Sequence, residues 1–253
     1  MIFEFLIVTE QRHMSELGFR EIWRALDNPL FTLQKYDIRE PFRNKYIADQ
    51  YQDAYEMLEK GLILKGKNNF FGAIDYRITG TIDWRFNIDT GTFGEAELTE
   101  ILNLLTLLHR ICVIIYGRGA SEPEYDLKHK EITDYEDGGR SIGWRGQSFW
   151  DFCDFLPGIY WLNLFGRELT EALGREKVLG LKEVDYLRTD NDLIIFKLQD
   201  PFASENVGPR LAVESKLREQ LGRDYFFDIT EKDRAFSHPS GFKRYLERLE
   251  SEE

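Results

Sequence analysis

Residues 81–89 have the sequence TIDWRFNID, and this stretch decides the fold. Its apolar residues Ile82, Trp84, Phe86 and Ile88 alternate strictly with polar and charged residues. Period-two alternation is typical of a β-strand in a sheet that buries one face and leaves the other in water. An antiparallel sheet covered by helices on one side satisfies that pattern, so the stretch predicts an α+β fold.

The segments on either side of this strand extend it into a first unit. The sequence predicts strands at 2–9, 71–78 and 111–116 and helices at 15–26, 47–58 and 95–110. Residues 31–43 show little periodicity and are predicted to be a connection, and Gly117-Arg118-Gly119 is predicted to end the last strand. If the two early helices share one crossover, the order is strand–helix–strand–strand–helix–strand, which is the split βαβ pattern of a ferredoxin-like unit.

The second half of the chain repeats this order. It predicts strands at 158–163, 184–188, 193–198 and 225–227 and helices at 166–179, 209–221 and 240–251. We therefore predict an α+β fold of two ferredoxin-like (βαββαβ) units, with antiparallel-rich sheets covered by helices. The expected division is a first unit at 1–117, an acidic and aromatic connecting segment at 118–150, and a second unit with a C-terminal helix at 151–253. The two units could equally pack as one domain.

The connecting segment concentrates acidic and aromatic residues. Residues 122–137 contain seven acids against two lysines, and tryptophans follow at positions 144 and 150. One interpretation is a solvated charged loop followed by core aromatics. The other is an exposed surface on which aromatics anchor a partner while carboxylates steer it during association. Under the second interpretation the predicted partner-binding residues are Glu131, Asp134, Tyr135, Glu136, Asp137, Trp144 and Trp150.

Composition restricts the partners and the compartment. The chain has 33 basic and 45 acidic residues and a net charge of −12, which argues against nucleic acid or an anionic membrane as the main partner. Hydrophobic residues (42%) and aromatic residues (14%) suffice for a folded core. Two cysteines, an N-terminus without a basic leader and the lack of a long apolar run predict a soluble cytoplasmic protein without a disulfide framework.

Known catalytic and metal-binding motifs are either absent or in the wrong context. Residues 139–143 match the G-x-S-x-G pattern of serine hydrolases, but they follow a charged stretch instead of an apolar strand. Residues 214–216 match the E-x-K of metal-dependent nucleases, yet they fall in a predicted helix. The four histidines and two cysteines lack zinc-ligand spacing, and the sequence contains no Walker A motif and no glycine-rich dinucleotide-binding loop. We therefore predict no metal and no cofactor.

Residues 155–181 carry a resemblance to a known family. They begin with FLPGIYWLNLFG, which combines a Pro-Gly turn, an aromatic strand ending in Trp-x-Asn, and Phe-Gly before a helix. This block, the strand at 83–86 and the segment 221–228 resemble the bacterial immunity proteins of polymorphic and type VI secretion toxin systems, in particular the immunity protein 52 family. The resemblance implies a non-enzymatic protein that binds and neutralises a cognate toxin, and an acidic inhibitor suits a basic toxin. It transfers no catalytic or binding residue to this chain.

Two other functions are compatible with the sequence. An enzyme with a carboxylate site could use Asp134, Glu136 or Asp137, which would require a concave pocket around them. A small-molecule sensor or assembly domain could instead dimerise through an edge of a ferredoxin-like sheet. The oligomeric state and the identity of the toxin stay open at this point.

Overall fold

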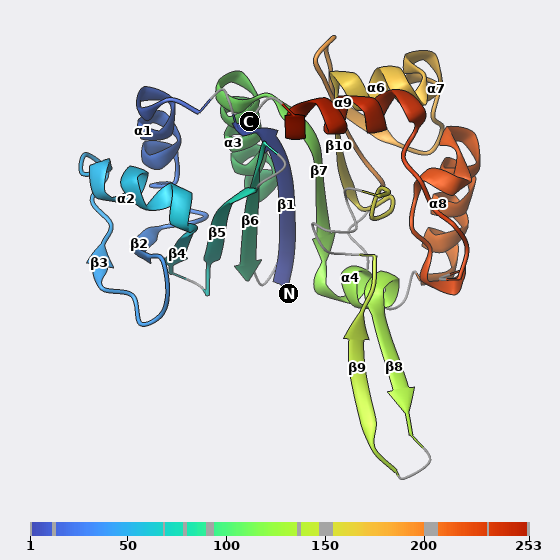
Figure 1. Cartoon of the computed structure of the whole chain (residues 1–253), viewed down its shortest axis with the longest axis horizontal. Coiled ribbons are helices and arrows are strands. Elements are labelled where there is room, and N and C mark those ends of the chain that lie inside the picture. The colour runs from blue at the N-terminus through green and yellow to red at the C-terminus, as the bar shows by residue number, and fades with distance from the viewer. Residues whose placement is uncertain are drawn as a thin grey trace. The chain divides into compact units, whose positions relative to one another are not determined.

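The chain forms two compact units, which are shown in Figure 1. The computed structural model describes residues 2–11, 14–67, 69–77, 80–89, 94–135, 138–146, 154–199, 207–231 and 233–251. The first unit comprises Met1–Gly119, Leu164–Gly166 and Leu249–Glu253, and the second comprises Ala120–Asn163 and Arg167–Arg248. Both combine helices with antiparallel strand pairs, so the predicted α+β fold is confirmed.

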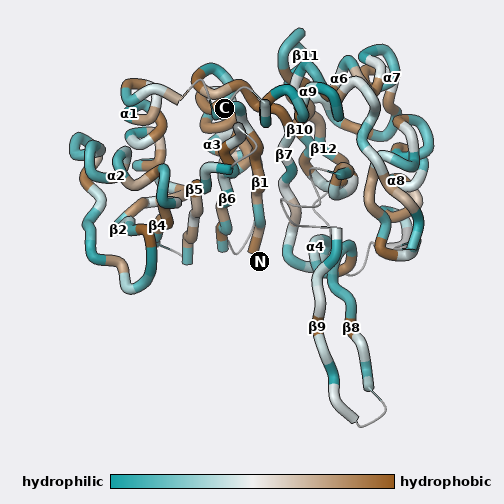
Figure 2. The backbone as a smooth tube through the Cα atoms, viewed as in Figure 1, coloured by the Kyte–Doolittle hydropathy of each residue, from teal (hydrophilic) through white to brown (hydrophobic). Residues whose placement is uncertain are grey.

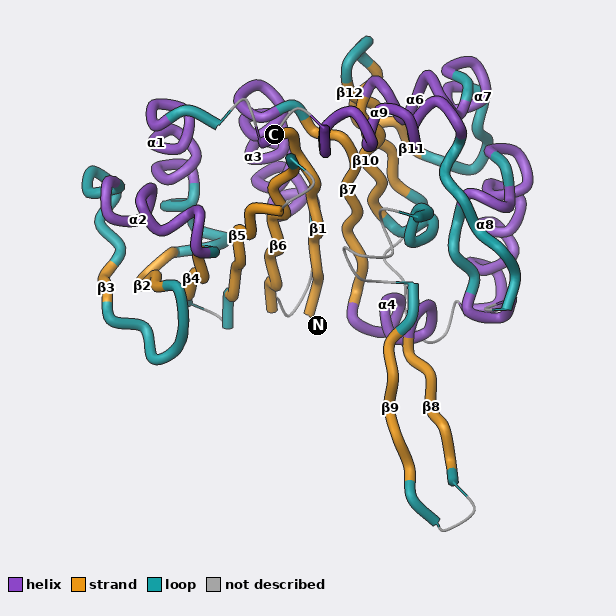
Figure 3. The backbone as a smooth tube through the Cα atoms, in the orientation of Figure 1, coloured by secondary structure: helices purple, strands orange, loops and turns teal. Residues whose placement is uncertain are grey.

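The first unit contains the predicted split βαβ order. Its elements are β1 (Ile2–Glu10), α1 (Glu16–Ala25), β2 (Leu33–Asp37), β3 (Asn44–Lys45), α2 (Gln52–Met57), β4 (Leu62–Gly66), β5 (Phe71–Arg77), β6 (Thr81–Asp89), α3 (Glu95–Cys112) and β7 (Ile114–Ser121). The strands follow one another in the order β7-β1-β6-β5-β4-β2-β3 (Figure 3). Strand β6 lies between β1 and β5 and is antiparallel to both, and α3 then leads to β7 beside β1.

The alternating strand β6 supplies the centre of the first unit's core. Its four apolar residues are all buried, and Phe86 lies opposite Phe5 of β1 in the register. The Trp84 indole N–H donates to Thr9 Oγ1 at 3.0 Å, which satisfies the one polar group of that side chain. Figure 2 shows hydrophobic residues along β1 and α3. The burial pattern predicted from TIDWRFNID is therefore confirmed for its apolar positions.

The long crossover of the first unit differs from the prediction. Residues 31–43 include the strand β2, which pairs with β3 on one side and β4 on the other. A register shift interrupts the pairing of β2 with β4, and this irregularity explains why no alternation is visible in the sequence. The predicted helix at 47–58 begins only at Gln52. Strands β2, β3 and β4 thus widen the sheet beyond β5.

Strand β7 is longer than predicted, because its glycines do not end it. It continues through Gly117 and Gly119 to Ser121, and all of its residues are buried. A Cβ on Gly117 would lie 3.2 Å from the Cβ of Leu164, so glycine at this position permits the close approach of Leu164 to the strand. The prediction that Gly117-Arg118-Gly119 terminates the strand is therefore wrong.

The second unit contains both a sheet and a separate hairpin. Its elements are α4 (Glu122–His129), β8 (Lys130–Asp134), β9 (Arg140–Trp144), β10 (Leu162–Gly166), α6 (Arg167–Leu173), α7 (Arg175–Leu179), β11 (Asp185–Thr189), β12 (Leu193–Lys197), α8 (Val207–Leu221) and α9 (Ser240–Ser251). Strands β11, β12 and β10 are neighbours in that order, whereas β8 and β9 form a two-stranded sheet of their own. The last residues of β10, Leu164–Gly166, belong to the first unit.

Several predicted elements of the second unit are corrected by the structure. The helix at 166–179 is broken into α6 and α7 by Gly174, whose φ of +91° is left-handed. The strand predicted at 158–163 begins at Leu162. The strand predicted at 225–227 is reduced to one bridge between Phe226 and Leu156. Among the described residues, the second unit therefore lacks the fourth strand of a complete βαββαβ unit.

The segment 118–150 is far more regular than predicted. It begins inside β7, continues through the helix α4, and then forms the hairpin β8–β9. None of the helices in the described ranges is long and apolar enough to span a bilayer. The two strands of the hairpin contain three of the residues predicted to bind a partner, Glu131, Asp134 and Trp144, and Tyr135 follows directly after β8.

Candidate functional site

The hairpin β8–β9 extends away from the other elements of its unit (Figures 1 and 3). Its register places Lys130 opposite Trp144, Ile132 opposite Ile142, and Asp134 opposite Arg140. Side chains directly opposite each other in an antiparallel pair lie on the same face, as do residues two positions apart along a strand. These six side chains therefore share one face of the hairpin.

The centre of this face is apolar and open to solvent. Ile132, Ile142 and Trp144, which we call the apolar face, are 52%, 56% and 42% exposed. Charged groups border it, because Asp134 binds Arg140 at 2.6 Å and the Lys130 ammonium lies 5.7 Å from the centre of the Trp144 ring. Exposed apolar side chains gathered on one surface and edged by polar groups are typical of a protein-binding site.

The opposite face of the hairpin is polar. Glu131 forms an ion pair with Arg145, and the hydroxyls of Tyr135 and Ser141 are 3.0 Å apart. Tyr135 is 54% exposed, so its ring is also available to a partner. The two faces of the hairpin therefore differ in chemistry. Exposing the apolar face to water costs more free energy than exposing the polar face.

The predicted partner-binding residues divide into two groups. The structure places Glu131, Asp134, Tyr135 and Trp144 on or directly beside this hairpin. Glu136, Asp137 and Trp150 lie outside the described residues. Sequence reasoning missed Ile132 and Ile142. The one signal for this face is the spacing of Ile142 and Trp144, two residues apart, which is a weak strand signal.

The expected concentration of unpaired acids is reduced by local ion pairs. Glu131 and Asp134 bind Arg145 and Arg140, both of which follow the acidic stretch 122–137. Asp126 binds Lys130 at 2.7 Å, and Glu124 is fully buried. Four of the seven acids in the stretch are thus matched by basic groups, which a count over a sequence window cannot reveal.

The base of the hairpin is fixed by His129, the last residue of α4. Its Nδ1 lies 2.7 Å from the carbonyl oxygen of Arg145, while its own carbonyl oxygen accepts the Arg145 N–H at 2.9 Å. Its Nε2 lies 2.5 Å from the Tyr160 hydroxyl. Gly146 follows with φ of +65°, and a Cβ there would collide with the Phe227 ring. The two chain ends of the hairpin are therefore held together at a buried point.

A buried network of four charged side chains holds α4 against α8. The Lys128 ammonium lies 2.9 Å from Glu124 Oε1 and 2.9 Å from Glu214 Oε2, and it also donates to the carbonyl oxygen of Ile159. Arg210 binds Glu214 at 3.1 Å and Glu124 at 3.5 Å. The two carboxylates and two cations balance, as buried charges require.

The four side chains of this network are almost completely shielded from water, so their charges must be balanced within the protein. Burial raises the pKa of Glu214 despite the opposing charge of Lys128. The backbone N–H of Trp161 donates to Glu124 Oε1 at 2.9 Å, so the loop after residue 155 is joined to the same cluster. We infer that the helix carrying the hairpin is rigidly positioned, which lowers the entropy cost of binding through the hairpin.

The catalytic motifs noted in the sequence do not form active sites within the described residues. Ser141 of the G-x-S-x-G match lies in the exposed strand β9 and not on a strand-to-helix elbow. Glu214 of the E-x-K match binds Arg210 and Lys128, whereas Lys216 binds Glu183 at 3.3 Å. In these parts of the chain, no group of three or more His, Cys, Asp or Glu side chains is placed to hold a metal ion.

Comparison with known proteins supports the fold more than the family. No protein-family model matches the chain, and no curated protein matches it significantly. Among solved structures, it is similar to the type VI secretion system (T6SS) protein PA0821 of Pseudomonas aeruginosa, with a TM-score of 0.54 and 12% sequence identity. The match covers 98% of this chain and 82% of the other. At this identity the likeness establishes a shared fold.

Proposed function

We propose that this protein is a non-enzymatic immunity protein that binds and neutralises a cognate, basic bacterial toxin in the cytoplasm. The observation that carries the proposal is the hairpin β8–β9, which exposes Ile132, Ile142 and Trp144 on one face. The buried His129 and Lys128 clusters fix the base of this hairpin. A preformed projection with apolar anchors is suited to protein binding.

The size of the hairpin supports the proposal that a partner covers the apolar face. An isolated two-stranded hairpin is only marginally stable in water, and stability usually requires a third strand or packing on one face. Each strand of this hairpin has five residues, and its two isoleucines face each other across the pair. Burying them together with Trp144 would supply the missing packing, so we expect the hairpin to become better ordered in a complex.

Net charge favours a basic partner over a second copy of this chain. Each copy carries a charge of −12, so two copies repel each other at long range. A basic toxin is attracted by the same charge, which raises the association rate. Because the acids of the two described strands, Glu131 and Asp134, are paired with arginines, the molecule as a whole provides this attraction, while the apolar face provides the contact energy.

The similarity to the T6SS protein PA0821 is consistent with this proposal. Type VI secretion delivers toxins between bacteria, and the resemblance of residues 155–181 to toxin-immunity proteins points to the same biological setting. The fold likeness covers 98% of the chain, whereas the sequence resemblance is carried mainly by residues 155–181.

The proposal is tested by measuring binding to a candidate toxin encoded beside this protein. Isothermal titration calorimetry should give a tight one-to-one complex, and co-expression should protect cells from the toxin. Ile142→Asp should weaken binding by at least about 100-fold, because it places a charge in the centre of the contact. Ile47→Asp is the matched control, since Ile47 is 46% exposed in the first unit. Equal effects of the two substitutions would exclude the hairpin as the contact.

A further inference from the structure

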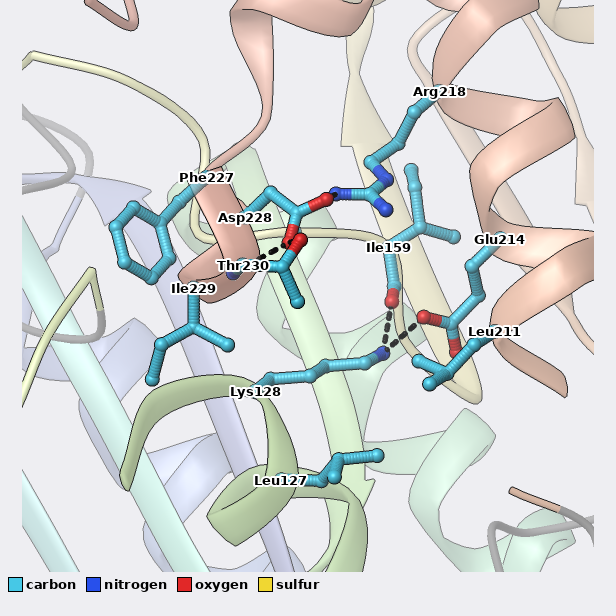
Figure 4. A pocket seen from close by; sticks show the side chains of 11 residues that line it. Leu127, Lys128, Ile159, Leu211, Glu214, Arg218, Phe227, Asp228, Ile229 and Thr230 are labelled. Carbon is cyan, nitrogen blue, oxygen red and sulfur yellow. Dashed lines mark hydrogen bonds and ion pairs between the residues drawn. The ribbon is translucent and has the colours of Figure 1, made fainter. Parts of the chain in front are cut away.

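A cavity of about 90 Å³ lies inside the second unit and is unrelated to the apolar face. It is lined by residues from α4, α8 and the segments 158–159 and 227–230, which Figure 4 shows from close by. Its apolar lining includes Leu127, Ile159, Leu211 and Ile229. This volume has room for several water molecules, so it can accommodate a group of amino-acid side-chain size.

Four charged side chains also line the cavity, and in three of them every polar atom already has a partner within the protein. Lys128 uses its three donors on Glu124, Glu214 and the Ile159 carbonyl. Glu214 accepts from Lys128 and Arg210 with its two oxygens. Asp228 accepts from Thr230 with one oxygen and from Arg218 with the other.

Arg218 is the exception. One of its Nη atoms donates to Asp228 at 2.5 Å, whereas its Nε and its second Nη have no partner among the described residues. The side chain is 15% exposed and forms part of the cavity wall (Figure 4). Among these four charged side chains, the polar atoms without a partner in the described residues are therefore guanidinium nitrogens beside an apolar surface.

A guanidinium binds a carboxylate with two parallel hydrogen bonds, and its flat donor fork is specific for that geometry. The neighbouring aliphatic side chains would cover a short hydrocarbon stem. We propose that this cavity binds an aliphatic carboxylate, with the carboxylate on Arg218 and the stem against Leu127, Leu211 and Ile229. The group could belong to a free small acid or to an acidic side chain of a partner protein, and the proposal does not depend on the identity of any toxin.

The test is a titration of the isotope-labelled protein with sodium butyrate, followed by NMR of methyl groups and arginine N–H groups at constant ionic strength. We expect saturable shifts at Arg218 Nε–H and at the methyls of Leu211 and Ile229, with a dissociation constant on the order of 1 mM. Butanol, which has the stem without the carboxylate, should give at least about tenfold weaker binding. Linear shifts spread over the surface, or equal binding of butanol, would overturn the proposal.

Substitutions separate binding at Arg218 from general charge effects. Arg218→Lys keeps the charge that Asp228 needs but loses the fork, and should weaken butyrate binding about tenfold. Arg223→Lys is the matched control and should leave binding unchanged, because Arg223 binds Glu219 and Glu231 outside the cavity. Unaltered binding by Arg218→Lys would refute the assignment.

A competition experiment distinguishes the two sources of the carboxylate. The probe is a blocked Gly-Glu-Gly peptide, which presents a glutamate side chain without free termini. Displacement of butyrate by the peptide at lower concentration supports an acidic side chain of a partner protein. Weaker displacement than by free butyrate supports a small free acid. Either outcome requires that the wild-type cavity binds butyrate.

Discussion

Replacing Lys128 by methionine is the sharpest test of how the hairpin is held in place. The substitution preserves an unbranched side chain of similar length and removes one charge. In the native protein, Lys128 and Arg210 balance Glu124 and Glu214, so the variant leaves two carboxylates with one cation. Neither carboxylate can regain water, because their side chains are 0% and 4% exposed.

The size of the effect follows from this burial. Breaking a buried ion pair by removing one partner costs about 3–5 kcal/mol, because an uncompensated charge stays behind. The Lys128 side chain is 10% exposed, which favours the lower end of that range. We therefore expect the free energy of unfolding to fall by about 3 kcal/mol. Adding Glu214→Gln restores the charge balance and should recover about 1–2 kcal/mol of the loss.

The assay is urea denaturation followed by fluorescence, with Lys130→Met as the matched control. Lys130 binds Asp126 at 2.7 Å, but both side chains are about one-third exposed. Loss of such an exposed pair costs less than about 1 kcal/mol. If Lys128→Met and Lys130→Met destabilise the protein equally, or if Glu214→Gln recovers nothing, the network does not hold α4 as we infer.

Two further predictions concern the hairpin base and the buried glutamate. Gly146→Ala should destabilise the protein by about 2 kcal/mol in urea denaturation, because φ is +65° and the new Cβ would lie 2.1 Å from the Phe227 ring. Gly138→Ala, with φ of +84° and nothing within 4 Å, should cost about half as much, and equal losses would argue against a tight base. The raised pKa of Glu214 predicts that its protonation stabilises the fold fully below the ordinary value of 4.5, and that this contribution is lost as pH rises through the raised value. The wild type should therefore lose stability relative to Glu214→Gln as pH rises above 4.5 and through the raised pKa, and a constant difference would contradict the shift.

The central strand and the main helices could be predicted because their environments are uniform along the element. Every second residue of β6 faces one core, and α3 and α9 were expected at 95–110 and 240–251 because their apolar residues recur with helical spacing. Elements with an irregular environment were either missed, as β2 was, or predicted with the wrong end, as β7 was. Strand β2 has a register shift against β4, and β7 is buried on every residue, so neither alternates.

The hairpin β8–β9 was missed for a different reason. A strand pair that buries neither face lacks the contrast between inside and outside on which alternation depends. Its two strands contain one isoleucine each and a single tryptophan amid charged, small and hydroxyl residues, so the sequence shows an acidic stretch more clearly than a strand. The network of Lys128 and Glu214 was equally out of reach, because it joins α4 to α8 across a separation of 86 residues. Only the short-range pairs within each helix, Glu124 with Lys128 and Arg210 with Glu214, have a recognisable helical spacing.

The closed base of the hairpin has a consequence for how such a protein can change. Because His129 and Arg145 are hydrogen-bonded to each other through their backbones, the chain leaves and re-enters the unit at a single point. Residues 130–144 can therefore be shortened, lengthened or exchanged for another sequence while the charged network and the sheet keep their packing. A change of the hairpin sequence would therefore alter the partner specificity proposed above without rebuilding the rest of the fold.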